Sequence, residues 1–425
     1  MTHTFDVQRL RGLIPELLAP VGSLERLKTV LLYGADAAYL GGKDKLNLRA
    51  GAEGFSWQEL DQAVSLAAAA RAKIYYCLNA LPRQAGLGDA EESLLRLKDS
   101  GVAGVIIADP GLVDLARELA PDLPIHLSTQ ANTCNARSAA FWARAGASRV
   151  NLARELDRDQ IAQVCDALEE LAPGLEVEVF VHGAMCLAVS GQCLMSAWLN
   201  DRPGNLGQCT HPCRFLYRPS RVELEEELRP GRTTFELRGV RDEFCGVFSP
   251  EDLCLVTYLP WLAGAGIAAL KIEGRMRTAG VLGQTVNVYR TALDDLARGE
   301  FRPEIYLREL AWLTTRPLSS GFFLPGSREI LVEPQSENEI VGKIAAQLVG
   351  PAQGGGFSVT VRALWDSSRP AQVLLPGLRV IDLEPGAYSL ENHRGERVER
   401  LHSGVTAVLH ADIDRPPSGV LLRTL

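Results

Sequence analysis

Four of the chain's cysteines are crowded into one short segment that could bind metal. Cys186, Cys193, Cys209 and Cys213 follow the pattern Cys-x6-Cys-x15-Cys-x3-Cys, and Gly and Pro residues interrupt the chain between them. Four soft thiolates in one such segment are what a tetrahedral thiolate site or an iron–sulfur cluster requires. The segment spanning residues 182–214 is therefore predicted to bind metal.

Disulfides and structural zinc are the alternatives for these cysteines. The N-terminus lacks a basic stretch followed by an apolar run, and nine cysteines in 425 residues is an odd number at low density, so a reduced, cytoplasmic protein is expected. Zinc knuckles usually carry two tight Cys pairs, and here Cys209 and Cys213 form one such pair. An iron–sulfur cluster is the favoured interpretation, and zinc is the alternative. Cys77, Cys134 and Cys165 fall in predicted strands or helices and are expected in the core.

Charged residues near the cysteines could serve a negatively charged cluster or an anionic substrate. Four cations, Arg214, Lys271, Arg275 and Arg277, could offset the charge of the thiolates or bind a carboxylate or phosphate. Glu273 could hold its cationic neighbours in place. The alternative for this set is ordinary surface charge. His182 could contact substrate, or it could be a strand-end histidine that orients the loop.

The elements that must position these residues alternate between short apolar runs and helical patterns. Ser23, Ser56 and Asp157 each precede a helical pattern in the way that N-cap residues do. Eight short apolar runs are predicted strands: 17–22, 37–42, 73–79, 104–109, 125–130, 149–153, 175–181 and 268–273.

Eight strands, each followed by a helix or a long excursion, predict an α/β protein with a TIM-like (β/α)8 barrel. An open doubly wound sheet is the alternative architecture. In a barrel, chemistry belongs at the carboxyl ends of the strands, where Asn79, Gln130, His182, Cys186 and the run 271–275 all fall.

Length and composition indicate an ordinary globular protein of two domains. The chain has 425 residues, 46% of them hydrophobic and 23% charged, and no apolar run approaches the roughly 20 residues needed to cross a bilayer. The net charge of −8 gives no general attraction to nucleic acid, so any such binding must depend on a local basic patch. Membrane insertion is not expected.

The last quarter of the chain has a different sequence pattern. Pro- and Gly-punctuated segments give way to short alternating runs at 340–344, 357–362, 371–375 and 405–409, typical of a small antiparallel barrel. The predicted domains are a barrel at 1–320, which carries the cysteine segment, and a small all-β, barrel-like domain at 335–425.

The stretch from Glu178 to Ser196, EVFVHGAMCLAVSGQCLMS, resembles the signature of the U32 family of collagenase-like peptidases. The likeness extends through 209–214, 249–254, 271–276 and the opening 17–23. It therefore covers about residues 16–300.

The resemblance implies more than the family name suggests. Several members are oxygen-independent RNA or quinone hydroxylases, and this chain resembles the bacterial tRNA 5-hydroxyuridine synthase subfamily, which uses prephenate as hydroxyl donor. In such proteins four cysteines hold a 4Fe-4S cluster, and the motif maps them to Cys186, Cys193, Cys209 and Cys213. Some relatives take the fourth ligand from further along, which makes Cys245 or Cys254 the alternative to Cys213. The residues expected to act on substrate are His182, Lys271, Glu273 and Arg275.

The sequence supports the peptidase interpretation poorly. It has no His-Glu-x-x-His run and no Gly-x-Ser-x-Gly elbow, which leaves Cys186 near His182 as the conceivable nucleophile and base. The expected function is an iron–sulfur-dependent, oxygen-independent hydroxylase of the tRNA wobble uridine. Its expected partners are tRNA and a small hydroxyl donor, and the sequence names no protein partner. A U32 peptidase and a zinc-stabilised, non-catalytic binding protein remain the alternatives.

Overall fold

The computed structural model describes residues 14–43, 46–48, 54–186, 188–216, 223–225, 233–236, 251–327, 329–333 and 344–425. Eight parallel strands form a closed barrel, in which the last strand pairs with both the first and the seventh. The barrel strands are β1 (Glu16–Pro20), β2 (Ala37–Leu40), β3 (Lys73–Leu78), β4 (Gly104–Ile107), β5 (Ile125–Leu127), β6 (Ala147–Asn151), β7 (Glu176–Ala184) and β11 (Ala269–Ile272). This closure confirms the TIM-like barrel and rules out the open sheet.

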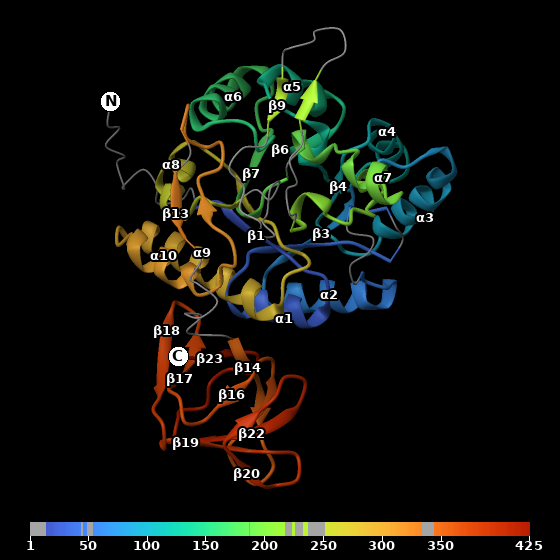
Figure 1. Cartoon of the computed structure of the whole chain (residues 1–425). Helices are drawn as coiled ribbons and strands as arrows, with labels where there is room; N and C mark the ends of the chain where they lie inside the picture. Colours follow the sequence, from blue (N-terminus) through green and yellow to red (C-terminus); the bar gives the residue numbers. More distant parts are fainter. Residues whose placement is uncertain are drawn as a thin grey trace.

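Helices surround the barrel (Figure 1) and start at capping residues. Ser23, Ser56 and Asp157 each accept a hydrogen bond from a backbone N–H of the first turn, as the sequence predicts. The outer helices are α1 (Leu24–Leu32), α2 (Trp57–Ala69), α3 (Leu87–Leu97), α4 (Pro110–Leu119), α5 (Ala136–Arg144), α6 (Arg158–Leu171), α8 (Leu259–Gly264), α9 (Ala279–Arg298) and α10 (Pro303–Ala311). None of the helices in the described ranges is long and apolar enough to cross a bilayer.

Short elements extend the barrel sheet beyond its eight strands. β10 (Asp252–Cys254) pairs antiparallel with the end of β7, and β12 (Leu318–Ser319) and β13 (Ile330–Val332) continue from it. The helix α7 (Met195–Asn200) lies within the cysteine segment, and β8 (Glu223–Glu225) pairs with β9 (Thr233–Glu236). The sheet that contains the barrel thus continues past residue 320 to Val332.

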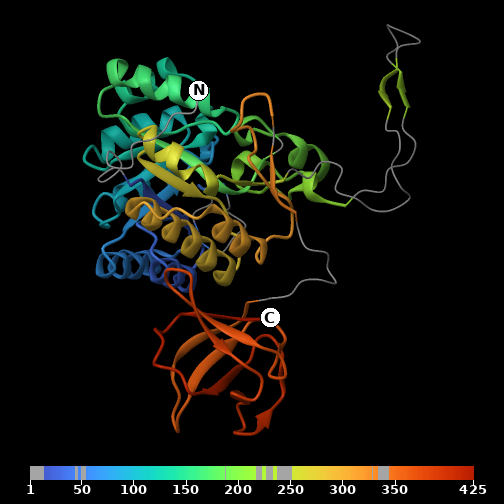
Figure 2. The ribbon, with the colours of Figure 1, turned by 90° about the vertical axis from the view of Figure 1, so that its left-hand side faces the viewer.

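The C-terminal region forms a separate antiparallel sheet, drawn in orange and red in Figures 1 and 2. Its own apolar core includes the fully buried Trp365. Its strands are β14 (Ile344–Pro351), β15 (Phe357–Val361), β17 (Ala371–Leu375), β18 (Arg379–Leu383), β19 (Tyr388–Glu391), β20 (Arg397–Val398), β22 (Thr406–Ala411) and β23 (Leu421–Thr424), with β16 (Trp365–Asp366) and β21 (Arg400–Leu401) paired beside them. The small all-β region is therefore present. Its predicted first residue, 335, lies in the segment 334–343, which is outside the described residues.

Buried polar contacts join the two regions. The hydroxyl of Tyr33, the residue directly after α1, donates to the Leu374 carbonyl, 2.8 Å away, and accepts from the Leu421 N–H. Arg423 forms a buried ion pair with Glu309 of α10 at 2.7 Å. The C-terminal sheet thus packs against the outside of the barrel.

Candidate active site

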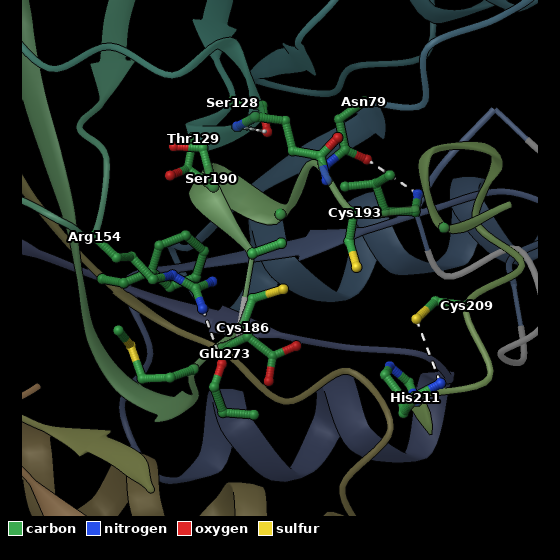
Figure 3. A pocket seen from close by; sticks show the side chains of 18 of the residues that line it. Asn79, Ser128, Thr129, Arg154, Cys186, Ser190, Cys193, Cys209, His211 and Glu273 are labelled. Atoms are coloured by element: carbon green, nitrogen blue, oxygen red, sulfur yellow. Dashed lines mark hydrogen bonds between the residues drawn. The ribbon is translucent and has the colours of Figure 1, made fainter. Parts of the chain in front are cut away.

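A cavity of about 180 Å³ opens at the carboxyl ends of the barrel strands. Its walls include residues one to three positions beyond the ends of five strands: Asn79 after β3, Ser128 after β5, Arg154 after β6, Cys186 after β7 and Glu273 after β11. Figure 3 shows these side chains around one open space. Because the loops at this end of a parallel barrel converge, residues far apart in sequence meet here.

All four cysteines of the predicted metal segment line this cavity. Cys186 is exposed, whereas Cys193, Cys209 and Cys213 are half-buried. Burial is the main cause that raises the pKa of Cys213; Arg214 opposes this shift, and the other three thiols add to it. The other three thiols are thus close enough to Cys213 to act on its charge.

The backbone around the cysteines turns sharply and donates hydrogen bonds to sulfur. The Met195 N–H lies 3.3 Å from Cys193 Sγ, and the His211 N–H lies 3.4 Å from Cys209 Sγ. His211 adopts left-handed backbone angles, with φ of 56°, directly before Pro212. This turn brings Cys213 back to the cavity that Cys209 lines.

The two metal interpretations place different demands on the four thiols. Among the described residues, no three Cys, His, Asp or Glu side chains converge closely enough to hold one metal ion. A structural zinc ion needs four ligands converging on a point, whereas a 4Fe-4S cluster takes one thiolate at each of four irons. All four thiols line one cavity, and the choice between a cluster and zinc stays a prediction.

Two arginines of the cavity wall are oriented by neighbouring backbone and aromatic groups. The Arg154 guanidinium lies 3.8 Å from the centroid of the Phe180 ring, and its Nη1 donates to the Ala184 carbonyl. Arg214 donates from Nη2 to the Met185 carbonyl, 3.1 Å away. Both cations are therefore held beside Cys186, as a negatively charged cluster or anionic substrate would require.

Arg275 is buried in the wall against Gly41. Its side chain is 6% exposed, and a Cβ built on Gly41 would lie 2.6 Å from Arg275 Nη1. Within the described ranges, no carboxylate forms an ion pair with Arg275. A buried guanidinium that faces a cavity in this way is suited to bind an anion.

Lys271 lies at the floor of the same cavity, but its charge is already compensated. Its Nζ is 2.8 Å from Glu178 Oε1, which also accepts a hydrogen bond from Asn151. Arg149 approaches the other Glu178 oxygen at 3.6 Å. Lys271 also lies under the rings of Tyr39 and Phe180. It therefore shapes the floor as one half of a buried ion pair.

His182 lies outside the cavity that the cysteines line. It borders a smaller cavity with Asp252 and Arg277, and its Nδ1 is 3.4 Å from the Tyr289 hydroxyl of α9. The register between β7 and β11 shifts after Phe180, so the strand bulges and His182 faces α9. Burial, with a smaller contribution from Arg277, lowers the His182 pKa to about 3. The role predicted for His182 stays a prediction, as does that of Arg277, which pairs with Asp252 at 2.5 Å.

Of the two alternative fourth ligands, Cys254 lies away from the cysteine cavity and Cys245 is not described. Cys254 is fully buried in β10, opposite His182, with its Sγ 3.8 Å from the Tyr289 hydroxyl, and it does not line the cysteine cavity. Cys245 lies outside the described residues. Of the other cysteines, Cys77 is buried and lines the cavity floor, while Cys134 and Cys165 are half-buried.

Several cavity residues were missed by sequence reasoning. They are polar or aromatic and lie within barrel strands, just beyond strand ends or on the loop before Cys193: Tyr39, Ser128, Thr129, Arg154, Glu155, Phe180, Ser190 and Phe322. Arg154 and Glu155 follow the end of β6, so charges just beyond a predicted barrel strand were the available signal.

The comparison with known proteins decides the family. The model of peptidase family U32 matches residues 22–332, which is well over half of the chain. The chain belongs to peptidase family U32.

The relatives of this U32 chain carry two kinds of name. "tRNA hydroxylation protein P" of Helicobacter pylori (strain ATCC 700392 / 26695) is 38% identical over 92% of this chain and 94% of its own length. "tRNA hydroxylation protein P1" of Bacillus subtilis (strain 168) is 35% identical over 74% of this chain and 72% of its own. A protein of Porphyromonas gingivalis (strain ATCC BAA-308 / W83) named "Collagenase" is 28% identical over 73% of each chain.

Proposed function

We propose that this U32 protein is an enzyme that hydroxylates a base of tRNA with the help of a 4Fe-4S cluster. The observation that carries the proposal is the placement of four thiols and three arginines around one cavity at the carboxyl face of the barrel, in a chain whose relatives include tRNA hydroxylation proteins. The finer expectation, from resemblance, is oxygen-independent 5-hydroxylation of the wobble uridine.

The residues that would hold the cluster are Cys186, Cys193, Cys209 and Cys213. All four line one cavity, where Arg154 and Arg214 would offset the negative charge of the cluster. When bound, such a cluster supplies one-electron chemistry that amino-acid side chains lack.

The cavity also contains cationic groups that could bind a second substrate, the hydroxyl donor. Replacing C–H by C–OH removes two electrons from the base and adds an oxygen atom, so a co-substrate must supply the oxygen and accept the electrons. The resemblance suggests prephenate, a hydroxylated dicarboxylate. Arg275 and Arg214 are suited to bind its carboxylates, because guanidinium groups pair with carboxylates in a bidentate manner.

The structure offers little support for a peptidase. A thiol protease needs a base within hydrogen-bond reach of its nucleophile. His182, the base that the sequence suggested for Cys186, borders a different cavity and has a pKa near 3. No described contact pairs it with Cys186.

The test is nucleoside mass spectrometry of tRNA from a deletion strain of the source organism. We expect hydroxylated uridine to disappear in the deletion strain and to return with the wild-type gene or with Cys165→Ser, a half-buried thiol on α6. It should not return with Cys193→Ser. An unchanged nucleoside profile in the deletion strain would refute the proposal, and collagen cleavage lost in Cys186→Ala would favour the peptidase.

A further inference from the structure

The loop between Cys186 and Cys193 has an unusual backbone at its centre. Ser190 adopts left-handed angles, with φ of 45° and ψ of 30°, although it is not glycine, and its side chain is 5% exposed. Residues with a Cβ avoid this region unless surrounding contacts hold them there. Those contacts therefore determine the path of the chain between two of the four thiols.

One carboxylate provides the strongest of these contacts. Glu155 Oε1 accepts a hydrogen bond from the Ser190 N–H at 2.5 Å. The Ser190 hydroxyl lies 3.3 Å from Glu155 Oε2 and 2.9 Å from Asn132 Oδ1, so it can donate its proton to either. Both oxygens of Glu155 thus face a single residue of the loop, and hydrogen bonds to a charged acceptor are stronger than neutral ones.

Other residues of the loop contact the segment that follows β5. The Gln192 Nε2 donates to the Gln130 carbonyl at 2.9 Å. Gly191, with φ of +77°, passes so close that a Cβ there would lie 2.8 Å from Gln130 Nε2. These contacts place the loop against the β5 side of the cavity, while Glu155 reaches it from the end of β6.

We propose that Glu155 is a positioning residue that fixes the loop carrying Cys186 and Cys193 before any metal binds. This inference rests on the proposed function, because it assigns Glu155 a role in building the cluster site. Glu155 does not ligate metal; it acts through Ser190. Its removal should let the loop relax from the left-handed turn and separate the two thiols from Cys209 and Cys213.

The experiment compares Glu155→Ala and Glu155→Gln with the wild type and with Glu169→Ala, an exposed carboxylate on α6. Iron and sulfide content is measured after anaerobic reconstitution. The affinity of the metal-free protein for Cd²⁺, a soft ion that binds thiolates, is measured by titration. Thermal unfolding followed by circular dichroism checks the fold of every variant.

We expect Glu155→Ala to bind Cd²⁺ on the order of 10- to 100-fold more weakly and to lose iron, as variants of residues that orient metal ligands do. Glu155→Gln can still accept a hydrogen bond from the Ser190 N–H, so its Cd²⁺ affinity should lie between those of Glu155→Ala and the wild type. The Cd²⁺ affinity of Glu169→Ala should match that of the wild type. Wild-type Cd²⁺ affinity in a folded Glu155→Ala would overturn the inference and leave the proposed function intact. Should Glu155→Ala fail to fold, wild-type affinity in Glu155→Asp, whose shorter side chain cannot keep the present contacts to the Ser190 N–H and hydroxyl, would overturn it.

The cluster proposal can also fail while the role of Glu155 is still tested. A wild-type protein that binds Cd²⁺ tightly but takes up no iron would refute the cluster, while the Cd²⁺ affinities of the variants would still decide the role of Glu155. A wild type that binds neither would overturn both.

Discussion

Lys271 and Glu178 form a buried ion pair beneath the cysteine cavity, with Nζ and Oε1 2.8 Å apart. Lys271 lies on the last barrel strand and Glu178 on the seventh, so the pair spans the closure of the barrel. Their side chains are 5% and 2% exposed, so the attraction is little screened by water. Lys271 therefore lines the cavity, and the pair also links two neighbouring barrel strands.

Glu178→Gln should lower the free energy of unfolding by about 3 kcal/mol, because it leaves the buried Lys271 ammonium without a compensating charge. The measurement is urea unfolding followed by circular dichroism. Glu92→Gln removes an exposed partner of Arg96 on α3 and should cost less than about 0.5 kcal/mol. Equal small losses in the two variants would contradict the assignment of a buried, stabilising pair.

Replacing any one of Cys186, Cys193, Cys209 or Cys213 with Ser should abolish stable iron binding, because an iron that loses its thiolate is open to solvent. Cys134→Ser and Cys165→Ser should retain iron. Iron and sulfide analysis of anaerobically purified protein measures this. Normal iron in Cys213→Ser together with its loss in Cys245→Ser would move the fourth ligand to Cys245.

Gly41→Ala should reduce hydroxylation while leaving the cluster in place. The added methyl group would lie 2.6 Å from both Arg275 Nη1 and Asn47 Cγ, so these two side chains must move, and displacements of this kind lower rates on the order of 10- to 100-fold. Arg275→Glu should lower turnover at least as much. Gly88→Ala on α3 meets nothing within 4 Å and serves as the control. Turnover is measured on tRNA in vitro, and unchanged turnover in Gly41→Ala would argue against a role for Arg275.

Acid should destabilise the protein partly through His182. Burial holds the folded pKa near 3, below the ordinary value of 6.5, so the neutral form is favoured in the folded state. The resulting stability is fully present above pH 6.5 and decreases as the pH falls from 6.5 toward 3. Between pH 7 and pH 5 the loss should be about 2 kcal/mol.

Urea unfolding of the wild type and of His182→Asn at both pH values isolates this contribution. The variant should lose about 2 kcal/mol less than the wild type over the same interval. Identical pH dependence in the two proteins would show that His182 does not titrate as its surroundings indicate.

The strands, the caps and the grouping of four cysteines in one segment could be predicted from the sequence. The eight apolar runs fall on the eight barrel strands, and Ser23, Ser56 and Asp157 cap helices as expected. These are local properties: a period-two apolar run or a capping side chain acts on its immediate neighbours. The cysteine spacing is local in the same sense, which is why a single segment indicated a metal site.

The rest of the cavity's lining was decided by tertiary structure. Arg154 and Glu155 reach the cysteines because β6 and β7 pair in parallel, so both strands end at the same face. The bulge after Phe180 leaves Phe180 in the cavity and turns His182 toward Tyr289, although even spacing along a strand predicts the same face for both. Strand pairing and register are contacts between distant parts of the chain, so no local pattern encodes them.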